Sequence, residues 1–343
     1  ALGRNQLVLD LTNPEVRSYL IDSLTEVFSS CNLSYVKWDY NRTLTDMWGS
    51  KLTNQGEFFH RYVLGLYEIL EELVLRFPKI LFEACASGGN RFDLGMLCYF
   101  PQIWTSDDTD YLERLFIQTG TSYGYPLSTM GAHVSAVPNH QTLRNTPLAS
   151  RFNISMFGVL GYELNLTALP GTEITQIKKQ VELYKQFRKT LQYGQFYRSN
   201  KTIFDKNNCY FWVIDEERTI VGYFQGLVHP DQQEDILYIY GLTPHEKYKM
   251  KNLPQKINLK TFGGLINLVS PIRLKLNGRL HNFICRVYQL KTSKEEYIFT
   301  GAMAEKAGIR LQGQFLGTGF NNQVRVIGDF GSRIYLLEKC KKN

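Results

Sequence analysis

The first 194 residues alternate between short apolar runs and longer segments whose apolar residues recur at helical spacing. Strands are predicted at residues 6–11, 34–39, 80–85, 102–105, 131–135 and 157–162. Helices are predicted at 14–30, 56–78, about 110–120, 147–155 and 172–192. Regular alternation of strands and helices is typical of a parallel sheet, and this number of units predicts a (β/α)8 barrel. Because only six strands are found, we expect about two strand–helix units to be absent on the N-terminal side.

The pattern changes after Gly194. Runs rich in β-branched and aromatic residues, separated by turn residues, follow at 211–214, 219–224, 236–240, 286–290 and 333–337. This texture predicts an antiparallel β-sandwich. The chain is therefore expected to contain a (β/α)8-barrel domain at 1–194 and a C-terminal β-sandwich domain at 195–343.

Composition and cysteine spacing restrict the class of protein. The 343 residues are 43% hydrophobic and 21% charged, which is typical of a globular chain with a large core. No apolar run reaches the roughly 18 residues of a membrane span, so no membrane partner is expected. The six cysteines are scattered without a C-x-x-C pair, which argues against a metal site and fits a reducing cytoplasm. The chain starts at Ala1 without Met, and we expect it to be a fragment.

The positive charge is concentrated in the second half of the chain. Residues 195–343 carry 22 Lys and Arg against 13 Asp and Glu, whereas residues 1–194 carry 17 against 19. A basic segment can attract nucleic acid. Here the lysines are spread along the segment and form no basic motif, so no nucleic-acid partner is predicted.

Acidic residues fall at the ends of three predicted barrel strands. Asp39, Glu83 and Asp107 each follow an apolar run, and the C-terminal ends of barrel strands are where catalytic groups lie. Two carboxyl groups facing each other across a barrel mouth can hydrolyse a glycosidic bond. The alternative for any one of them is a loop-capping role.

Residues near these carboxylates also allow two interpretations. Ser87-Gly88-Gly89 could let the backbone approach a sugar ring, or could form a strand-to-helix turn or a phosphate cradle, although it lacks the lysine and spacing of a P-loop. Trp38 and Trp104 could offer their ring faces to a sugar, or could belong to the core.

Four motifs resemble those of the bacterial α-galactosidases of glycoside hydrolase family 36. They are Tyr35-Val36-Lys37-Trp38-Asp39-Tyr40-Asn41-Arg42, Cys85-Ala86-Ser87-Gly88-Gly89-Asn90-Arg91-Phe92-Asp93, Trp104-Thr105-Ser106-Asp107-Asp108-Thr109-Asp110 and the segment from Met130 to His140. The resemblance runs from Gly3 to the C-terminus and is strongest over residues 1–165. The loop after Cys85 has fewer glycines than in many relatives, and the family's N-terminal β-sandwich and first barrel strands have no counterpart in this chain.

The resemblance implies an incomplete barrel that acts by double displacement. It implies Asp39 as nucleophile and Asp107 as general acid/base, with their carboxyl groups about 5–5.5 Å apart as retaining enzymes require. It also implies a galactose-binding role for Arg4, Lys37, Cys85 and Gly88, to which we add Trp38, Asn41 and Trp104 from their positions in the motifs.

The implied activity is hydrolysis of terminal α-galactosyl residues in small sugars of the melibiose and raffinose type. Two alternatives remain open, namely a galactosyltransferase on the same scaffold and an inactive sugar-binding fragment. The resemblance further implies a homo-oligomer, a tetramer. A cytoplasmic location is expected from the scattered cysteines, and no metal or organic cofactor is expected because no cluster of His, Cys or Asp has ligand spacing.

Overall fold

The structure, a computed structural model, describes residues 2–3, 5–200, 203, 207–230, 235–268, 270–315 and 324–340. The chain forms two compact units. The first comprises Ala1–Asp108 with Ser128–Gly131, and the second comprises Thr109–Leu127 with Ala132–Asn343.

Five strands of the described chain form one sheet in the order β1-β2-β3-β4-β5. They are β1 (Tyr35–Asp39), β2 (Leu81–Cys85), β3 (Gln102–Trp104), β4 (Met130–Ser135) and β5 (Val159–Glu163). The pairs β1–β2, β2–β3 and β3–β4 are parallel. Neighbours in the sheet follow the order of the sequence, as in a (β/α)8 barrel, and the predicted incomplete barrel is confirmed.

The strand predicted at residues 6–11 does not form. Among the described residues, the β-pairing of this segment is limited to an isolated bridge between Gly3 and Gln6, and Leu7 and Leu9 are exposed. A strand needs a neighbour that completes its backbone hydrogen bonds. The sheet ends at β1 without pairing to this segment, so its apolar run led to a wrong prediction.

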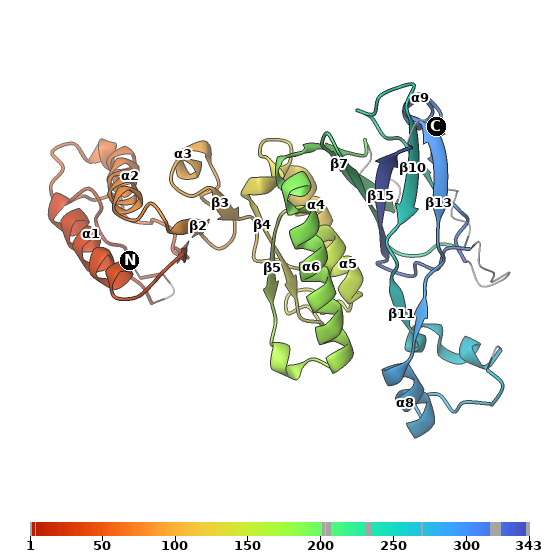
Figure 1. The fold of residues 1–343 in the computed structure, drawn as a ribbon. Helices are drawn as coiled ribbons and strands as arrows, with labels where there is room; N and C mark the ends of the chain where they lie inside the picture. The colour runs from red at the N-terminus through yellow and green to blue at the C-terminus, as the bar shows by residue number, and fades with distance from the viewer. Residues whose placement is uncertain are drawn as a thin grey trace. The chain divides into compact units, whose positions relative to one another are not determined.

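The first unit packs two long helices against its strands. α1 (Pro14–Ser29) and α2 (Phe58–Arg76) run side by side (Figure 1), while η1 (Gln55–Glu57) and α3 (Leu94–Leu97) are short. Asn13 caps α1 by accepting a hydrogen bond from the Glu15 amide. One buried cluster joins the helices to β2 and β3; it includes Ile21, Phe28, Ile69, Leu70, Leu73, Phe82, Ala84 and Ile103.

The second unit contains three further helices and the antiparallel sheets. The helices are α4 (Tyr111–Thr121), α5 (Leu148–Ser155) and α6 (Gly171–Tyr193), with the short turns η2 (Leu127–Thr129) and η3 (Leu166–Ala168) between them. Their bounds agree closely with the predicted ones. Among the described helices, none combines the length and apolar character needed to cross a bilayer.

The predicted antiparallel β-rich part is confirmed. Its main sheet has the order β13-β10-β15-β8-β7-β6, and β11-β12 and β14-β9 form separate two-stranded ribbons. The strands are β6 (Gln195–Arg198), β7 (Asn208–Ile214), β8 (Thr219–Gln225), β9 (Ile236–Leu237), β10 (Lys247–Asn252), β11 (Lys256–Asn258), β12 (Gln289–Lys291), β13 (Glu296–Thr300), β14 (Ile309–Arg310) and β15 (Ser332–Lys339). η4 (Leu259–Leu268), α8 (Arg279–Val287) and α9 (Gly301–Lys306) lie between strands.

The strand predicted at 286–290 is wrong over most of its length. α8 continues to Val287, and β12 begins only at Gln289. His281 and Cys285, four residues apart, are the buried residues of α8, which is the spacing of one helical face. A five-residue window around Tyr288 is too short to show that period.

Tyr111 connects α4 to the six-stranded sheet within the second unit. Its buried hydroxyl lies 3.1 Å from the Gln225 carbonyl and 3.0 Å from the Gly331 carbonyl, and accepts a hydrogen bond from the Gln225 amide. Nearby, the Phe157 ring meets those of Phe211 and Phe224. α4 and the segment after α5 therefore share a core with β7 and β8.

We expect Tyr111→Phe to lower the free energy of unfolding by about 1–3 kcal/mol, because buried backbone groups lose the hydrogen bonds that the hydroxyl supplies beside the direct bond between the Gln225 amide and the Gly331 carbonyl. Urea denaturation followed by circular dichroism measures the change. Tyr19→Phe is the matched control, since Tyr19 is 67% exposed, and should shift stability by less than about 0.5 kcal/mol. Equal effects of the two substitutions would contradict a structural role for the Tyr111 hydroxyl.

Candidate active site

The polar residues of β1 and β2 lie on one face of the sheet. In the parallel register Lys37 pairs with Glu83 and Asp39 pairs with Cys85, and alternate side chains of a strand point to the same side. Along β1, Lys37 and Asp39 are exposed whereas Val36 and Trp38 are half-buried. The sheet therefore has a polar face with the candidate residues and an apolar face toward α1 and α2.

Glu83 is the buried anion of the polar face. Its carboxylate, only 1% exposed, accepts hydrogen bonds from the Tyr35 hydroxyl and from the Gln102 amide at 3.2 Å. The Lys37 ammonium lies 3.7 Å from Glu83 Oε1 and 4.7 Å from the centre of the Trp104 ring. Glu83 was predicted to lie at the end of a strand, but it lies within β2. Its carboxylate therefore orients Lys37 rather than facing the barrel mouth.

Asn41 links the carboxylate of Asp39 to the glycine-rich loop. Its Nδ2 donates a hydrogen bond of 2.5 Å to Asp39 Oδ2. Its Oδ1 accepts from the backbone amide of Ser87 at 2.7 Å and from the Ser87 hydroxyl at 3.1 Å. Both ends of the Asn41 amide contact protein groups, so this residue orients Asp39 and the loop.

The glycine-rich loop approaches the backbone that carries Asp107. Ser87 and Gly88 have φ angles of 49° and 83°, in the left-handed region. A Cβ atom on Gly88 would lie 2.7 Å from Ser106 Cα and 3.2 Å from the Asp107 amide nitrogen. Only glycine allows both the backbone conformation and this close approach.

Asp107 is exposed just beyond β3. Its Oδ1 accepts a 3.0 Å hydrogen bond from Trp104 Nε1. Because the Trp104 ring is buried, its indole N–H holds the Asp107 carboxylate in a fixed position. Asp110 has a different role, because its carboxylate caps α4 through the amides of Leu112 and Glu113. The acidic residues of this motif thus divide into an exposed Asp107 and a helix-capping Asp110.

Cys85 remains a protonated thiol at neutral pH. Burial raises its pKa to about 11, and the neighbouring Asp39 carboxylate adds to the rise because it disfavours a second negative charge. A protonated thiol can donate a weak hydrogen bond.

The structure brings together most, but not all, of the predicted site residues. Lys37, Asp39, Asn41, Cys85, Gly88, Trp104 and Asp107 belong to the contacts described above. Trp38 instead packs on the apolar face, where its ring lies 6.2 Å from that of Phe100. Its neighbours Lys37 and Asp39 point the other way, so we exclude Trp38 from the site. Arg4 lies outside the described residues.

Sequence reasoning missed the network around Glu83. Tyr35 and Gln102 were assigned no role, yet both contact its carboxylate. The sequence spacing could have indicated this network. Lys37 and Asp39 are two residues apart, as are Glu83 and Cys85, and this spacing places each pair on one face of its strand. Among the described residues, no group of three or more His, Cys, Asp or Glu side chains could hold a metal ion.

Two protein families match consecutive parts of the chain. Residues 1–194 match the melibiase family, and residues 210–337 match the C-terminal domain of glycosyl hydrolase family 36. The α-galactosidase AgaA of Geobacillus stearothermophilus is 42% identical over 297 residues, which are 85% of this chain and 40% of that protein. The α-galactosidase Mel36A of Lactobacillus acidophilus is 42% identical over 269 residues, covering 76% of this chain and 35% of that protein.

Solved structures give the same result. A crystal structure of an AgaA variant in complex with raffinose has a TM-score of 0.79 and 35% identity, and covers 99% of this chain and 40% of that one. The α-galactosidase of Lactobacillus brevis has a TM-score of 0.80 and 37% identity, with 100% and 40% covered. The chain thus spans about 40% of the length of these relatives.

We expect Gly88→Ala to lower the free energy of unfolding by about 1–3 kcal/mol, because a side chain at positive φ is strained and its Cβ meets fixed backbone. Gly120→Ala in α4 is the control, since a Cβ there meets nothing within 4 Å and alanine favours the helix by up to about 1 kcal/mol. Urea denaturation of both variants tests the difference. A neutral Gly88→Ala would show that the loop does not need this conformation.

We also expect Cys85 to resist alkylation by iodoacetamide at pH 8, whereas the exposed Cys31 reacts. Asp39→Asn removes the adjacent charge, so the pKa of Cys85 should fall and its alkylation rate should rise about threefold to tenfold. Peptide mass spectrometry measures both sites, with Asp22→Asn as the control. Unchanged Cys85 reactivity in Asp39→Asn would mean that the carboxylate does not influence the thiol.

Proposed function

Because the chain belongs to the melibiase family, we propose that it forms the catalytic centre of a retaining α-galactosidase. The observation that carries this proposal is the placement of Asp39 and Asp107. Asp39 ends β1 and Asp107 follows β3, so both lie at the C-terminal edge of one parallel sheet. Asn41, Ser87 and Gly88 connect these two positions through hydrogen bonds and close backbone approach.

In the proposed reaction, Asp39 attacks the anomeric carbon of an α-galactoside while Asp107 gives its proton to the departing oxygen. This step breaks the glycosidic bond and forms a covalent β-galactosyl ester on Asp39. Asp107 then takes a proton from water, which attacks the same carbon and releases α-galactose. Two inversions at that carbon give net retention.

The surrounding residues have supporting roles in this proposal. Lys37 would place a positive charge beside the sugar, and its pairing with Glu83 limits where the ammonium can lie. Asn41 would keep Asp39 in position for attack. Trp104 would hold Asp107 through its indole N–H, and the Gly88 backbone would leave room for the sugar ring.

The proposed substrates carry a terminal α-galactosyl group on a small sugar, as raffinose and stachyose do. Variants of the related AgaA have been crystallised with these two sugars. We further propose catalytic and C-terminal domains at 1–194 and 195–343, and a cytoplasmic homotetramer without a cofactor. The six free cysteines support a reducing compartment.

A galactoside-binding part that needs further residues for turnover is the second candidate. Two observations favour it: Lys37 and Asp39 are exposed, and the chain spans about 40% of its relatives. Both candidates use the same sugar-binding face, but only the first predicts turnover by the chain alone.

Hydrolysis of 4-nitrophenyl α-galactoside separates the two candidates. The chain is assayed alone and joined to the part of AgaA that its match does not cover. Activity only in the joined protein would favour the second candidate for the separate chain. In the active form, Asp39→Asn should reduce kcat/KM by at least about 10³-fold, and Asp22→Asn should leave it unchanged. An active Asp39→Asn, or no activity in either form, would reject the assignment.

Azide distinguishes the roles of the two carboxylates. With Asp39→Gly, azide should enter from the face left open and give β-galactosyl azide. With Asp107→Gly, the Asp39 ester should still form from an activated substrate, and azide should give α-galactosyl azide. NMR of the products reads the configuration, and the reverse pattern would exchange the two roles.

A further inference from the structure

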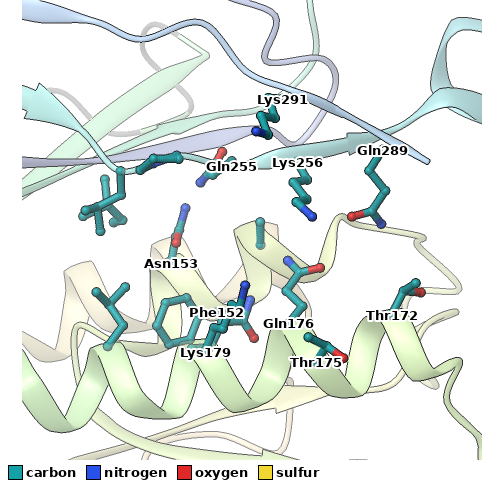
Figure 2. Close-up of a pocket in the computed structure, with 16 residues that line it drawn as sticks. Phe152, Asn153, Thr172, Thr175, Gln176, Lys179, Gln255, Lys256, Gln289 and Lys291 are labelled. Carbon is teal, nitrogen blue, oxygen red and sulfur yellow. The ribbon is translucent and has the colours of Figure 1, made fainter. Parts of the chain in front are cut away.

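A cleft of about 320 Å³ lies within the second unit, between helices α5 and α6 and the β11–β12 ribbon (Figure 2). Pockets that hold small ligands measure about 300–1,000 Å³, so the cleft can take a monosaccharide-sized molecule. None of its residues belongs to the candidate active site.

Part of the polar lining serves to hold the walls together. Asn153 donates to the Ser332 hydroxyl at 2.8 Å, and Gln180 accepts from the Tyr162 hydroxyl at 3.0 Å. Gln255 similarly accepts from Arg333. These contacts fix α5, α6 and the start of the ribbon, so the cleft is a built feature.

Other polar groups in the lining have no such role. The side chains of Thr172, Gln176 and Gln289 make no hydrogen bond to any described part of the chain. Figure 2 shows Gln289 projecting from the ribbon and Gln176 facing the gap from α6. Amide and hydroxyl groups placed in this way can donate to and accept from the hydroxyl groups of a sugar.

Three lysines line the same cleft without a compensating acid. Lys256 on β11 stands directly opposite Lys291 on β12, a like-charge pair that destabilises a two-stranded ribbon. Lys179 comes from α6 on the other wall. No carboxylate lines the cleft, and no described acidic residue forms an ion pair with any of the three. A bound anion would relieve this repulsion.

The ribbon turns its polar side to the cleft. Ile257 pairs with Leu290, between the Lys256–Lys291 pair and the Asn258–Gln289 pair. Adjacent pairs in a ribbon face opposite sides, so this apolar pair points away from the side that lines the cleft. A ribbon that served only to cover the helices would turn its apolar side toward them.

The N-terminus of α6 lines the same cleft, and Glu173 in its first turn already places one negative charge at this end of the helix. This 23-residue helix starts after Pro170, which makes no side-chain cap, and Thr172 and Thr175 in its first turns line the cleft. The free amide groups of a helix N-terminus favour negative charge.

We propose that this cleft binds a phosphorylated carbohydrate. Lys179, Lys256 and Lys291 contact the phosphate, which carries about −1.5 to −2 charges at neutral pH and so matches several lysines better than a single carboxylate does. Thr172, Gln176 and Gln289 contact the sugar hydroxyl groups. The site is separate from galactoside cleavage, so its occupancy does not depend on the proposed function.

Isothermal titration calorimetry of the chain tests the site with four probes: glucose 6-phosphate, galactose 6-phosphate, inorganic phosphate and free galactose. At least one hexose phosphate should bind about tenfold or more tightly than both simpler probes. Lys179→Gln and Lys256→Gln should each weaken that binding by about tenfold or more, because each removes one charged hydrogen bond. Lys178→Gln is the control: this lysine is the neighbour of Lys179 on α6 and is exposed as Lys179 is, but it lies outside the lining and should change affinity less than twofold.

Four results would overturn the proposal. If neither hexose phosphate binds at millimolar concentration, the site is excluded. If Lys178→Gln weakens binding as much as Lys179→Gln does, the affinity comes from general surface charge. Equal affinity for inorganic phosphate would exclude recognition of the sugar, and equal affinity for galactose would exclude recognition of the phosphate. Because turnover is not measured, these results are distinguishable from a failure of the galactosidase assay.

Discussion

The buried carboxylate of Glu83 is the contact on which the polar face of the sheet depends. A charge taken out of water costs several kcal/mol unless partners compensate it, roughly 3–5 kcal/mol when one partner of a buried pair is removed. Here Tyr35, Gln102 and Lys37 supply those partners from the two neighbouring strands. The same contacts fix the ammonium of Lys37 near Trp104, so the positive charge of the site has a defined place before a ligand arrives.

The contacts around Asp39 and Asp107 depend largely on the backbone of the glycine-rich loop. The Asn41 side chain accepts a hydrogen bond from the Ser87 amide and donates one to Asp39. Gly88 packs closely against the backbone of Ser106, which precedes Asp107. Two carboxylates that are 68 positions apart in the sequence therefore share one set of neighbours. Small side chains in the loop are a requirement of this arrangement, because any Cβ at Gly88 would push on the strand end that carries Asp107.

Much of this could be predicted from the sequence, because periodicity reports which residues a strand or helix buries. The barrel strands from 34 onward and the long helices followed from that signal, and the motif resemblance implied the roles of Asp39 and Asp107. Two strand predictions failed for different reasons. The run at 6–11 has no pairing neighbour among the described strands, whereas the run near Tyr288 is the end of an amphipathic helix whose period a five-residue window is too short to show. The alternation of side chains along β1 and β2 explains two further differences: it sends Trp38 to the core and places Glu83 beside Lys37.

The shared core of α4, Phe157 and the six-stranded sheet also limits how this protein can evolve by exchange of segments. Two family models meet near residue 200, as if the chain were assembled from two exchangeable modules. Yet Tyr111 and Phe157, from the first, are buried against Gln225, Phe211 and Phe224 from the second. The two modules visible in the sequence thus share a buried core within the second unit. Recombination at that joint would separate complementary surfaces, and the two segments are expected to be inherited together.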